Sequence, residues 1–494
     1  MLLRHYQQES HMSAKPAPFL TAEHFFPLPD AETRLEALAR RVADDFHTLR
    51  HPDKPWVPPQ TGPDGEHVYD VIVAGAGQAG LAIGGYLLRE CVDNILLIDK
   101  APRGREGVWF DFARMPLIRS PKLYPGPDQG IPSLTYEAWH RARYGDASWD
   151  SFELVPVPLW TDYLDWVREV TKVPVRNETV LTGIEPHPNG LAIRVTTPNG
   201  TETLLTRRLV LATGHDGTGR WWMPDYLQAL PDHVRAQAAD PIDFNQLKGK
   251  TVAVLGIGAS AGDNAIASLE AGAATVHMFC RRDTHRRQQV YRWVMSAGFL
   301  RHCVDLDDEW RWRFVSYILE TRMAMPTETW NRLEKMSGFQ LHTSANWTNA
   351  RMKGGKAEIE TEKGLFEADF IISATGHDQD LTARPELAPF ADKVQLWSDV
   401  YTPAPEERND RLARYPYLDK DFCFTPKIPG DAPWLSRIHD FTFGPTMSFG
   451  PSGCSISTLR LTVPMLVAGV TKALFREDVA LHWESLKAHP DYIP

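Results

Sequence analysis

The stretch Val68-Tyr69-Asp70-Val71-Ile72-Val73-Ala74-Gly75-Ala76-Gly77-Gln78-Ala79-Gly80 decides the fold. An apolar run typical of a buried strand leads directly into Gly-x-Gly-x-x-Gly, and an apolar helix follows. Gly75 allows a tight turn, Gly77 lets the backbone approach a pyrophosphate, and Gly80 lets the helix pack closely on the strand. The stretch therefore predicts a dinucleotide-binding unit.

A second strand, predicted from Asn94 to Ile98, ends at Asp99, which lies 24 positions after Gly75. A carboxylate at that place can accept hydrogen bonds from the two hydroxyl groups of a ribose. We expect the adenosine diphosphate part of a dinucleotide to bind at Gly75, Gly77, Gln78, Ala79, Gly80, Asp99 and Lys100.

The same arrangement recurs from Thr251 to Ala261, where a second apolar strand enters Gly-x-Gly-x-x-Ala and a helix follows. This repeat predicts a second dinucleotide site in the same chain. We expect its contacts at Gly256, Gly258, Ala259, Ser260 and Ala261.

The second site differs from the first where the acid should stand. Cys280 occupies the position 24 residues after Gly256, and Arg281 and Arg282 follow it. An arginine can bind a ribose 2′-phosphate, which a carboxylate would repel, so the second nucleotide is predicted to be NADPH. Alternatively, the two arginines belong to a solvated charged run with Arg286 and Arg287.

Each fingerprint is followed downstream by a predicted β-hairpin and a strand that ends in Ala-Thr-Gly. The first strand ends at Thr213 and Gly214, and the second at Thr375 and Gly376. Small and flexible residues at a strand end suit a place where the backbone passes close to a nucleotide. The duplication predicts an α/β fold with two Rossmann-like dinucleotide-binding domains, each with an inserted hairpin.

Composition and charge exclude other classes. The 494 residues carry a net charge of -10, so no general basic field exists to hold a nucleic acid. The five cysteines are far apart, without a Cys-x-x-Cys pair or a Cys/His cluster, and indicate neither a disulfide framework nor a metal site. No apolar leader or membrane span stands out, so we expect a cytoplasmic protein without a membrane partner.

These motifs together resemble the two-dinucleotide-binding-domain flavoproteins. Within them the chain resembles the class B flavin monooxygenases, which include flavin-containing monooxygenases, YUCCA-type enzymes, Baeyer–Villiger enzymes and N-hydroxylases. Gly107-Val108-Trp109 is similar to the Gly-x-Trp segment over the flavin of that family, and Arg119-Ser120-Pro121-Lys122 to its Pro-Lys turn near the isoalloxazine. Ser260-Ala261-Gly262-Asp263 is similar to the run on its NADPH helix.

The resemblance implies FAD at the Gly75 site and NADPH at the Gly256 site. It implies a monooxygenase that forms a flavin C4a-hydroperoxide from O2 and oxygenates a small organic substrate, without a metal. Val108, Trp109, Thr213 and Gly214 are expected to be further FAD contacts. The residues expected near the reactive face of the flavin, and so the catalytic candidates, are Trp109, Arg119 and Ser120.

The predicted domain organisation follows the two fingerprints. Residues 1–64 form an N-terminal helical extension with a Pro-rich linker. Residues 65–225 and 385–494 form the FAD-binding domain, and residues 226–384 form the NADPH-binding domain. The latter contains an aromatic-rich insertion, 285–347, in which Trp310, Phe314 and Tyr317 fit the buried stripe of a helix.

Several alternatives stay open at this point. Of the family signature before the second fingerprint only His233 matches, which leaves open how tightly reduction is coupled to oxygenation. An NADPH oxidase or reductase without oxygen insertion, or a non-catalytic FAD-binding protein, is compatible with the two sites. Ser260 also fits the Gly-x-Ser-x-Gly of a serine hydrolase. A disulfide reductase is disfavoured because Cys91 stands alone after the first fingerprint. The sequence identifies no substrate, and a homo-oligomer is compatible with it.

Overall fold

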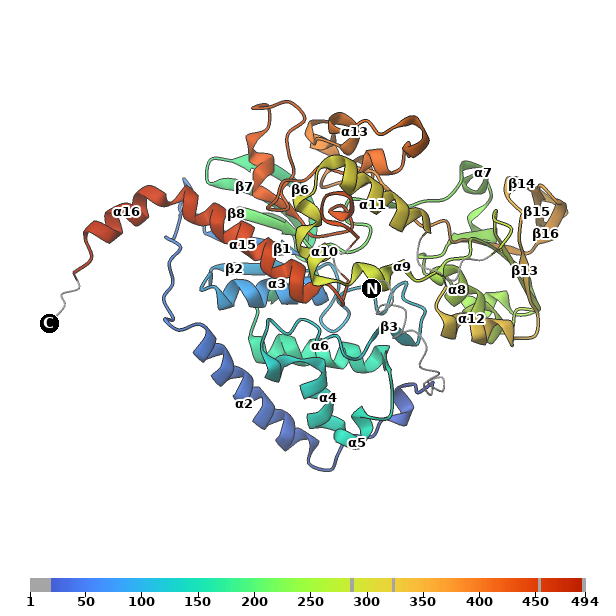
Figure 1. The fold of residues 1–494 in the computed structure, drawn as a ribbon, viewed down its shortest axis with the longest axis horizontal. Coiled ribbons are helices and arrows are strands. Elements are labelled where there is room, and N and C mark those ends of the chain that lie inside the picture. The colour runs from blue at the N-terminus through green and yellow to red at the C-terminus, as the bar shows by residue number, and fades with distance from the viewer. Residues whose placement is uncertain (1–18, 285–287, 322–324, 452–454, 491–494) are drawn as a thin grey trace, which may run out of the picture.

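The computed structural model describes residues 19–284, 288–321, 325–451 and 455–490, so Arg286 and Arg287 lie outside the described residues. The chain forms two main sheets with helices packed on them, and Figure 1 shows these two units side by side. This arrangement confirms the α/β fold class with two Rossmann-like units that the two fingerprints predict.

The first sheet, named sheet 1, is built from both ends of the chain. Its order is β5-β2-β1-β8-β7-β6, and β19 also pairs with β8. The long strand β8 serves two partners, since its amino half pairs antiparallel with β7 and its carboxyl half lies parallel between β1 and β19. The strands are β1 (Val68–Ala74), β2 (Ile95–Ile98), β5 (Val175–Arg176), β6 (Val180–His187), β7 (Gly190–Thr197), β8 (Gly200–Leu211) and β19 (Ile438–Asp440).

The second sheet, sheet 2, comes from the middle of the chain and is entirely parallel, in the order β10-β17-β11-β12-β13. A separate antiparallel meander, β14-β15-β16, precedes β17, as the predicted hairpin requires. The strands are β10 (Arg235–Gln237), β11 (Thr251–Leu255), β12 (Thr275–Phe279), β13 (Phe339–His342), β14 (Trp347–Lys353), β15 (Lys356–Thr361), β16 (Gly364–Ala368) and β17 (Phe370–Ser373).

Helices cover the parallel strands, which are apolar on both faces and must therefore be buried on both. On sheet 1, α3 (Gln78–Arg89) packs on β1 and β2, and α15 (Leu459–Glu477) packs on α3. On sheet 2, α8 (Ala259–Glu270) packs on β11, β12 and β17 and contacts α12 (Thr327–Glu334). In each unit the helix after the fingerprint begins at the carboxyl edge of the sheet.

A short antiparallel ribbon joins the two units. It pairs β9 (Gly219–Trp221), which follows sheet 1, with β18 (His377–Gln379), which follows sheet 2. The strands approach so closely that a Cβ on Gly219 would lie 2.1 Å from the carbonyl oxygen of Asp378. The chain passes from one unit to the other and back through this ribbon, and its two strands are hydrogen-bonded to each other.

A helical layer packs on α3 through α6 (Val157–Thr171). The hairpin β3 (Leu117–Pro121) and β4 (Leu154–Pro156) leads into this layer, whose core stacks Tyr136, Trp139 and Tyr163 around one another. The N-terminal helix lies against it at the lower edge of Figure 1. The helices are α2 (Ala31–Leu49), α4 (Tyr136–Tyr144), α5 (Asp146–Trp149) and α6 (Val157–Thr171).

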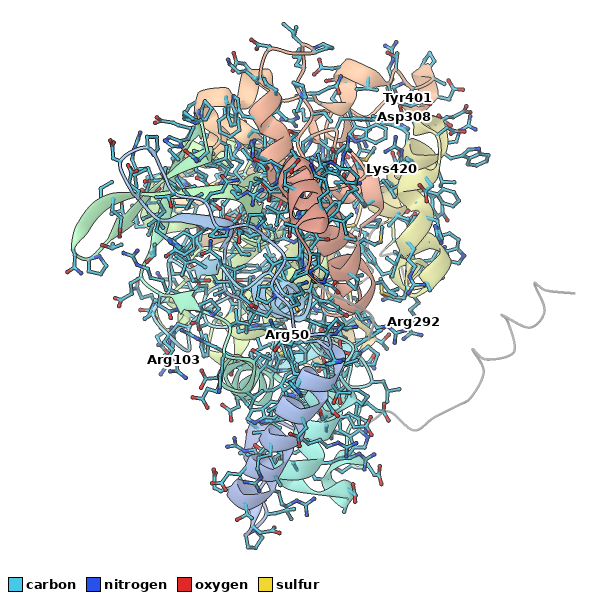
Figure 2. All side chains as sticks on the ribbon, turned by 90° about the vertical axis from the view of Figure 1, so that its left-hand side faces the viewer. Arg50, Arg103, Arg292, Asp308, Tyr401 and Lys420 are labelled. Atoms are coloured by element: carbon cyan, nitrogen blue, oxygen red, sulfur yellow. The ribbon has the colours of Figure 1, made fainter. Side chains whose placement is uncertain are left out.

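The predicted insertion 285–347 does not pack on sheet 2 alone. Trp312 on α11 (Asp308–Thr321) packs against Trp397 and Tyr401, with ring centroids 6.2 and 5.7 Å apart, and Figure 2 labels Asp308 and Tyr401 in the same upper part of its view. This segment therefore contacts residues predicted to belong to the FAD-binding domain, and the domain boundaries stay a prediction. The remaining helices are α7 (Asp225–Gln228), α9 (Val290–Val294), α10 (Ala297–His302), α11 (Asp308–Thr321), α13 (Trp397–Val400) and α14 (Thr446–Phe449).

The expected buried stripe of α11 is wrong. Trp310 and Tyr317 are 49% and 57% exposed, whereas Trp312, Val315 and Ile318 are buried. α11 turns a different face inward from the predicted one, because it packs on the aromatic residues around Trp397 and Trp312 contacts Trp397. Helical spacing alone allowed either face.

Buried arginines tie the C-terminal helix to sheet 1. Arg207 on β8 is fully buried and lies 3.4 Å from Asp70 on β1 and 2.7 Å from Asp478, which follows α15. Beyond Asp478, α16 (Val479–Lys487) extends away from the body and buries none of its residues (Figure 1). Within the described ranges, no helix is long and apolar enough to cross a membrane.

Candidate active site

Each fingerprint packs on the Ala-Thr-Gly strand of its own sheet. A Cβ on Gly75 would lie 2.2 Å from the carbonyl oxygen of Ala212, and a Cβ on Gly256 would lie 2.5 Å from that of Ala374. Both glycines also have positive φ, 107° and 126°. Only glycine satisfies both conditions, so the two motifs that the sequence pairs at long range meet in space in both units.

The first fingerprint faces the Gly-x-Trp segment. A Cβ on Gly77 would lie 3.3 Å from Gly107 Cα, and Trp109 is buried with its ring 6.4 Å from that of Trp160. A pocket of about 30 Å³ lies beside this contact, between the two segments and α6, and is lined by Ala76, Gly77, Leu81, Gly104, Glu106, Trp109, Phe110, Thr161, Leu164, Asp165 and Arg168. Trp109 therefore packs in the core and also lines this pocket, while Val108 beside it is half-buried.

Asp99 lies at the carboxyl end of β2 beside the glycine turn. Its Oδ2 accepts a hydrogen bond from Ala76 N at 2.7 Å and its Oδ1 accepts one from Ala101 N at 2.8 Å. Burial raises the pKa of Asp99, and these backbone donors oppose the shift. The carboxylate is thereby fixed at the edge where an adenosine ribose would lie, with Lys100 exposed next to it.

Helix α3 begins at the same turn, with Gln78 as its first residue and Gly77 at its N-cap. A Cβ on Gly80 would lie 1.9 Å from the carbonyl oxygen of Gly75, which is the close packing expected of the third glycine. Ala79 is buried between them. The first N–H groups of a helix have no partner within the helix, so the amino end of α3 fits the pyrophosphate of FAD.

A buried polar cluster at the end of β8 and β19 was not found from the sequence. Asp440 is fully buried, and its Oδ1 accepts hydrogen bonds from Thr442 N and Oγ1 at 2.9 and 2.6 Å. Its Oδ2, and Oγ1 of Thr213, have no hydrogen-bond partner among the described residues. Burial raises the pKa of Asp440 to about 7, against the two Thr442 bonds.

These orphaned oxygens fit the hydroxyl-rich part of FAD, because they lie at the carboxyl edge of the parallel strands where ligands bind in such sheets. Gly214 next to Thr213 has φ 95°, and a Cβ there would meet no atom within 4 Å. In the sequence Asp440 is an acid at the end of the short segment Ile438-His439-Asp440, far along the chain from the first fingerprint, and only the pairing of β19 with β8 brings it to this site.

The second fingerprint is more open. A Cβ on Gly258 would meet no atom within 4 Å, and Gly258 is the N-cap of α8, so the helix amino end is free to approach a pyrophosphate. Ser260 is exposed there, while Ala259 and Ala261 are buried. Thr375 Oγ1 donates to the carbonyl of Trp222, and Gly376 has φ 89°. The geometry fits NADPH.

The two arginines that follow β12 differ in their exposure and contacts. Arg281 is exposed and forms no ion pair with any residue of the described segments. Arg282 is half-buried and donates from Nη2 to the carbonyl of Glu320 at 2.9 Å. Cys280, at the place of the missing acid, is buried and its Sγ lies 3.2 Å from the carbonyl oxygen of Arg282. Arg281 is the better placed of the two for a 2′-phosphate.

Arg119, a catalytic candidate on β3, contacts the other unit. Its Nη2 forms an ion pair with Oδ2 of Asp263 on α8. Asp263 is buried, which raises the pKa of its carboxyl, and Arg119 opposes the shift. Ser120, next to Arg119, is half-buried. The structure therefore joins two motifs that the sequence connects only by family resemblance.

Four rings gather where the two Ala-Thr-Gly strands end. His215 stacks on Trp221 at 5.3 Å, approaches His377 at 5.4 Å and lies 4.3 Å from Phe443. Burial lowers the pKa of His215 to about 4, and burial with His215, Arg411 and Arg384 lowers that of His377 to about 3. Both imidazoles are therefore neutral near pH 7.

The hydrolase alternative finds no support in this arrangement. A serine hydrolase would need a histidine base beside Ser260, and His439 follows Ser260 in the chain as such a base could. His439 is instead buried in β19, where its Nδ1 lies 2.8 Å from the carbonyl oxygen of Asp421, and no described histidine hydrogen-bonds to Ser260. His233, the residue left of the family signature, lies exposed in a turn before β10.

Comparison with known proteins agrees with this geometry. A family model described as FAD-NAD(P)-binding matches residues 71–216, which include the first fingerprint and the first Ala-Thr-Gly. The chain is 36% identical over 445 residues to the FAD-dependent urate hydroxylase of Xanthomonas campestris pv. campestris, covering 90% of this chain and 94% of that enzyme.

Solved structures show a shared fold at low identity. The ornithine hydroxylase of Pseudomonas aeruginosa aligns with a TM-score of 0.64 at 16% identity, over 82% of this chain and all of that one. A bacillithiol disulfide reductase of Bacillus cereus aligns at 0.52 with 14% identity, over 82% and 100%. The fold alone therefore does not separate oxygenation from reduction. Because the similarity to the hydroxylase extends along nearly its whole length, the chain belongs to the class B flavin monooxygenases, which use FAD, NADPH and O2 to oxygenate a small molecule.

Proposed function

We propose that this monooxygenase hydroxylates urate or a closely related oxidised purine. The observation that carries the proposal is the 36% identity to a urate hydroxylase over 445 residues, a span that includes both nucleotide units. When bound, the flavin accepts a hydride from NADPH and activates O2, so the protein has to bind, orient and shield the reactants.

The ring cluster at the domain junction supports a flat heterocyclic substrate. His215, Trp221, His377 and Phe443 are each half-buried residues, and both ring nitrogens of His377 are buried without a hydrogen-bond partner among the described residues. Aromatic faces stack on planar rings. A neutral imidazole has one donor and one acceptor nitrogen, which matches the alternating N–H and C=O groups of an oxidised purine.

We also propose which residues bind the two cofactors. We assign FAD to the turn of Gly75 and Gly77, with Asp99 on the ribose, and NADPH to the turn of Gly256 and Gly258, with Arg281 on the 2′-phosphate. Trp109 covers the FAD turn. The overall balance is one substrate, O2, NADPH and one proton giving the hydroxylated substrate, NADP⁺ and water.

The test uses the FAD-loaded enzyme with NADPH, isotopically labelled O2 and urate. We expect urate to accelerate NADPH oxidation, the product to contain one labelled oxygen atom, and little hydrogen peroxide to form. Ornithine and lysine, the kind of substrate used by structural neighbours, serve as comparison compounds. If NADPH oxidation with urate gives hydrogen peroxide and unlabelled urate, the proposal is wrong and the enzyme oxygenates another molecule.

A further inference from the structure

The ion pair between Arg119 and Asp263 crosses from one nucleotide unit to the other. Arg119 lies on β3, which belongs to the helical layer packed on α3 of the first unit, and Asp263 lies on α8 of the second unit, 144 residues later. The Asp263 side chain is 7% exposed and that of Arg119 is 27% exposed. The pair is therefore shielded from water on the carboxylate side, where an unpaired charge is costly.

A second arginine of the same segment holds the next residue of α8. Arg114 Nε donates to Oδ1 of Asn264 at 3.2 Å, and Arg114 Nη2 donates to the carbonyl of Asp240. Asn264 is fully buried, and its Nδ2 donates to the carbonyl of Ser260 at 2.9 Å. Residues 114–119 of one unit thus bind the side chains of Asp263 and Asn264 in the first turns of α8 in the other unit.

Asp263 lies near the end of α8 where the dinucleotide would bind. It lies five residues after the N-cap Gly258, or about 7.5 Å along the helix at ~1.5 Å per residue, from the end where a pyrophosphate would bind. A bare carboxylate there would repel a negatively charged dinucleotide. The guanidinium of Arg119 is its ion-pair partner.

We propose that Arg119 is a positioning residue, which through Asp263 fixes the NADPH helix against the FAD unit and neutralises the carboxylate beside the dinucleotide. In this assignment Arg119 does not touch the reacting atoms, unlike the role expected from the family motif. The proposal concerns hydride delivery and does not depend on which substrate is oxygenated.

Two measurements on FAD-loaded protein distinguish the positioning of the NADPH helix from the neutralisation of the Asp263 carboxylate. Calorimetry with NADP⁺ gives a dissociation constant without any reaction, and anaerobic mixing with NADPH gives the limiting rate of flavin reduction. Removing the cation with Arg119→Gln should weaken NADP⁺ binding and slow reduction, each by about tenfold or more. Asp263→Asn should slow reduction similarly but leave NADP⁺ binding within about threefold of the parent, because no unpaired carboxylate remains.

The double variant Arg119→Gln/Asp263→Asn tests the coupling. We expect its NADP⁺ affinity to return to within about threefold of the parent while its reduction stays slow, and Arg119→Lys to recover part of the rate. Arg50→Gln is the matched control, since Arg50 bonds Asp93 at 2.9 Å in another arginine–aspartate pair, and it should change neither measurement (Arg50 is labelled in Figure 2). If the double variant binds NADP⁺ as weakly as Arg119→Gln, or if Asp263→Asn is reduced at the parental rate, the assignment is overturned.

Discussion

Gly77 is the residue at which the fingerprint and the Gly-x-Trp segment come closest. A Cβ there would lie 3.3 Å from Gly107 Cα and, in the proposed assignment, would fill the place of the FAD pyrophosphate. We therefore expect Gly77→Val to fold but to purify with less than about a tenth of the parental flavin, since close backbone approach to the phosphates is lost. Flavin absorbance per chain measures the effect.

The control for this change is Gly298→Val. Gly298 lies in α10, and a Cβ there would meet no atom within 4 Å, so this variant should retain its FAD. A folded Gly77→Val protein with one FAD per chain would show that the first fingerprint does not bind the cofactor.

Arg281 should decide between the two nicotinamide cofactors. A charge-assisted hydrogen bond contributes about 1.5–3 kcal/mol, so Arg281→Ala should raise the KM for NADPH roughly ten- to hundredfold. The KM for NADH should stay nearly constant, because NADH has no 2′-phosphate. Steady-state oxidation of both cofactors checks this, with the exposed Arg301→Ala as the control. Equal KM values for NADPH and NADH in the parent would contradict the role of Arg281.

The residues that sequence could predict are those that a backbone conformation requires. Gly75 and Gly256 have positive φ and face a carbonyl, so their identity reports local geometry directly. Asp440 and His215 reach the site only through contacts between segments far apart in the chain. The residues next to them in the sequence do not reveal these contacts. Family resemblance identified both the Arg119 segment and the run that contains Asp263, but not that these two side chains form an ion pair.

At the scale of elements, the sheets and their connections followed from the repeated motifs. The class of the protein, its cofactors and its fold are confirmed. The orientation of α11 was wrong because an amphipathic helix with aromatics on two faces does not show which face its partner covers. The residue-level assignments at the two nucleotide sites stay predictions.

The contact of α15 with sheet 1 should be sensitive to Arg207. Replacing this buried cation by methionine would leave Asp70 and Asp478 buried without their partner. Burial already raises the pKa of Asp70 to about 6 while Arg207 opposes the shift. We expect Arg207→Met to lower the free energy of unfolding by about 3–5 kcal/mol.

Thermal unfolding of the FAD-loaded protein measures this loss. Arg194→Met removes the exposed pair with Glu185 and is the control, expected to change stability by less than about 1 kcal/mol. Equal unfolding midpoints for the two variants would show that the buried network does not hold α15 to sheet 1.

At the scale of the whole molecule, the C-terminal segment completes the FAD unit. A chain ending at Arg437 lacks β19 and α15, and we expect it to bind no FAD although its fingerprint is intact. A chain ending at Asp478 loses α16 and the residues after it, and α16 buries none of its residues. It should keep its FAD and its NADPH oxidation within about twofold, as for a surface change. Flavin content and oxidation rate of both chains test this, and a flavin-loaded chain ending at Arg437 would contradict it.

The pairing of β19 with β8 also affects the order in which the units can fold during synthesis. Strand β8 ends at Leu211, but its parallel neighbour begins at Ile438, after the whole of sheet 2 has been made. At about 5–20 residues per second, the growing chain carries an unfinished sheet 1 for roughly 11–45 s. During that time the middle unit can complete all its strands. We therefore expect the unit encoded first to finish folding last, and FAD to bind only after β19 has been made.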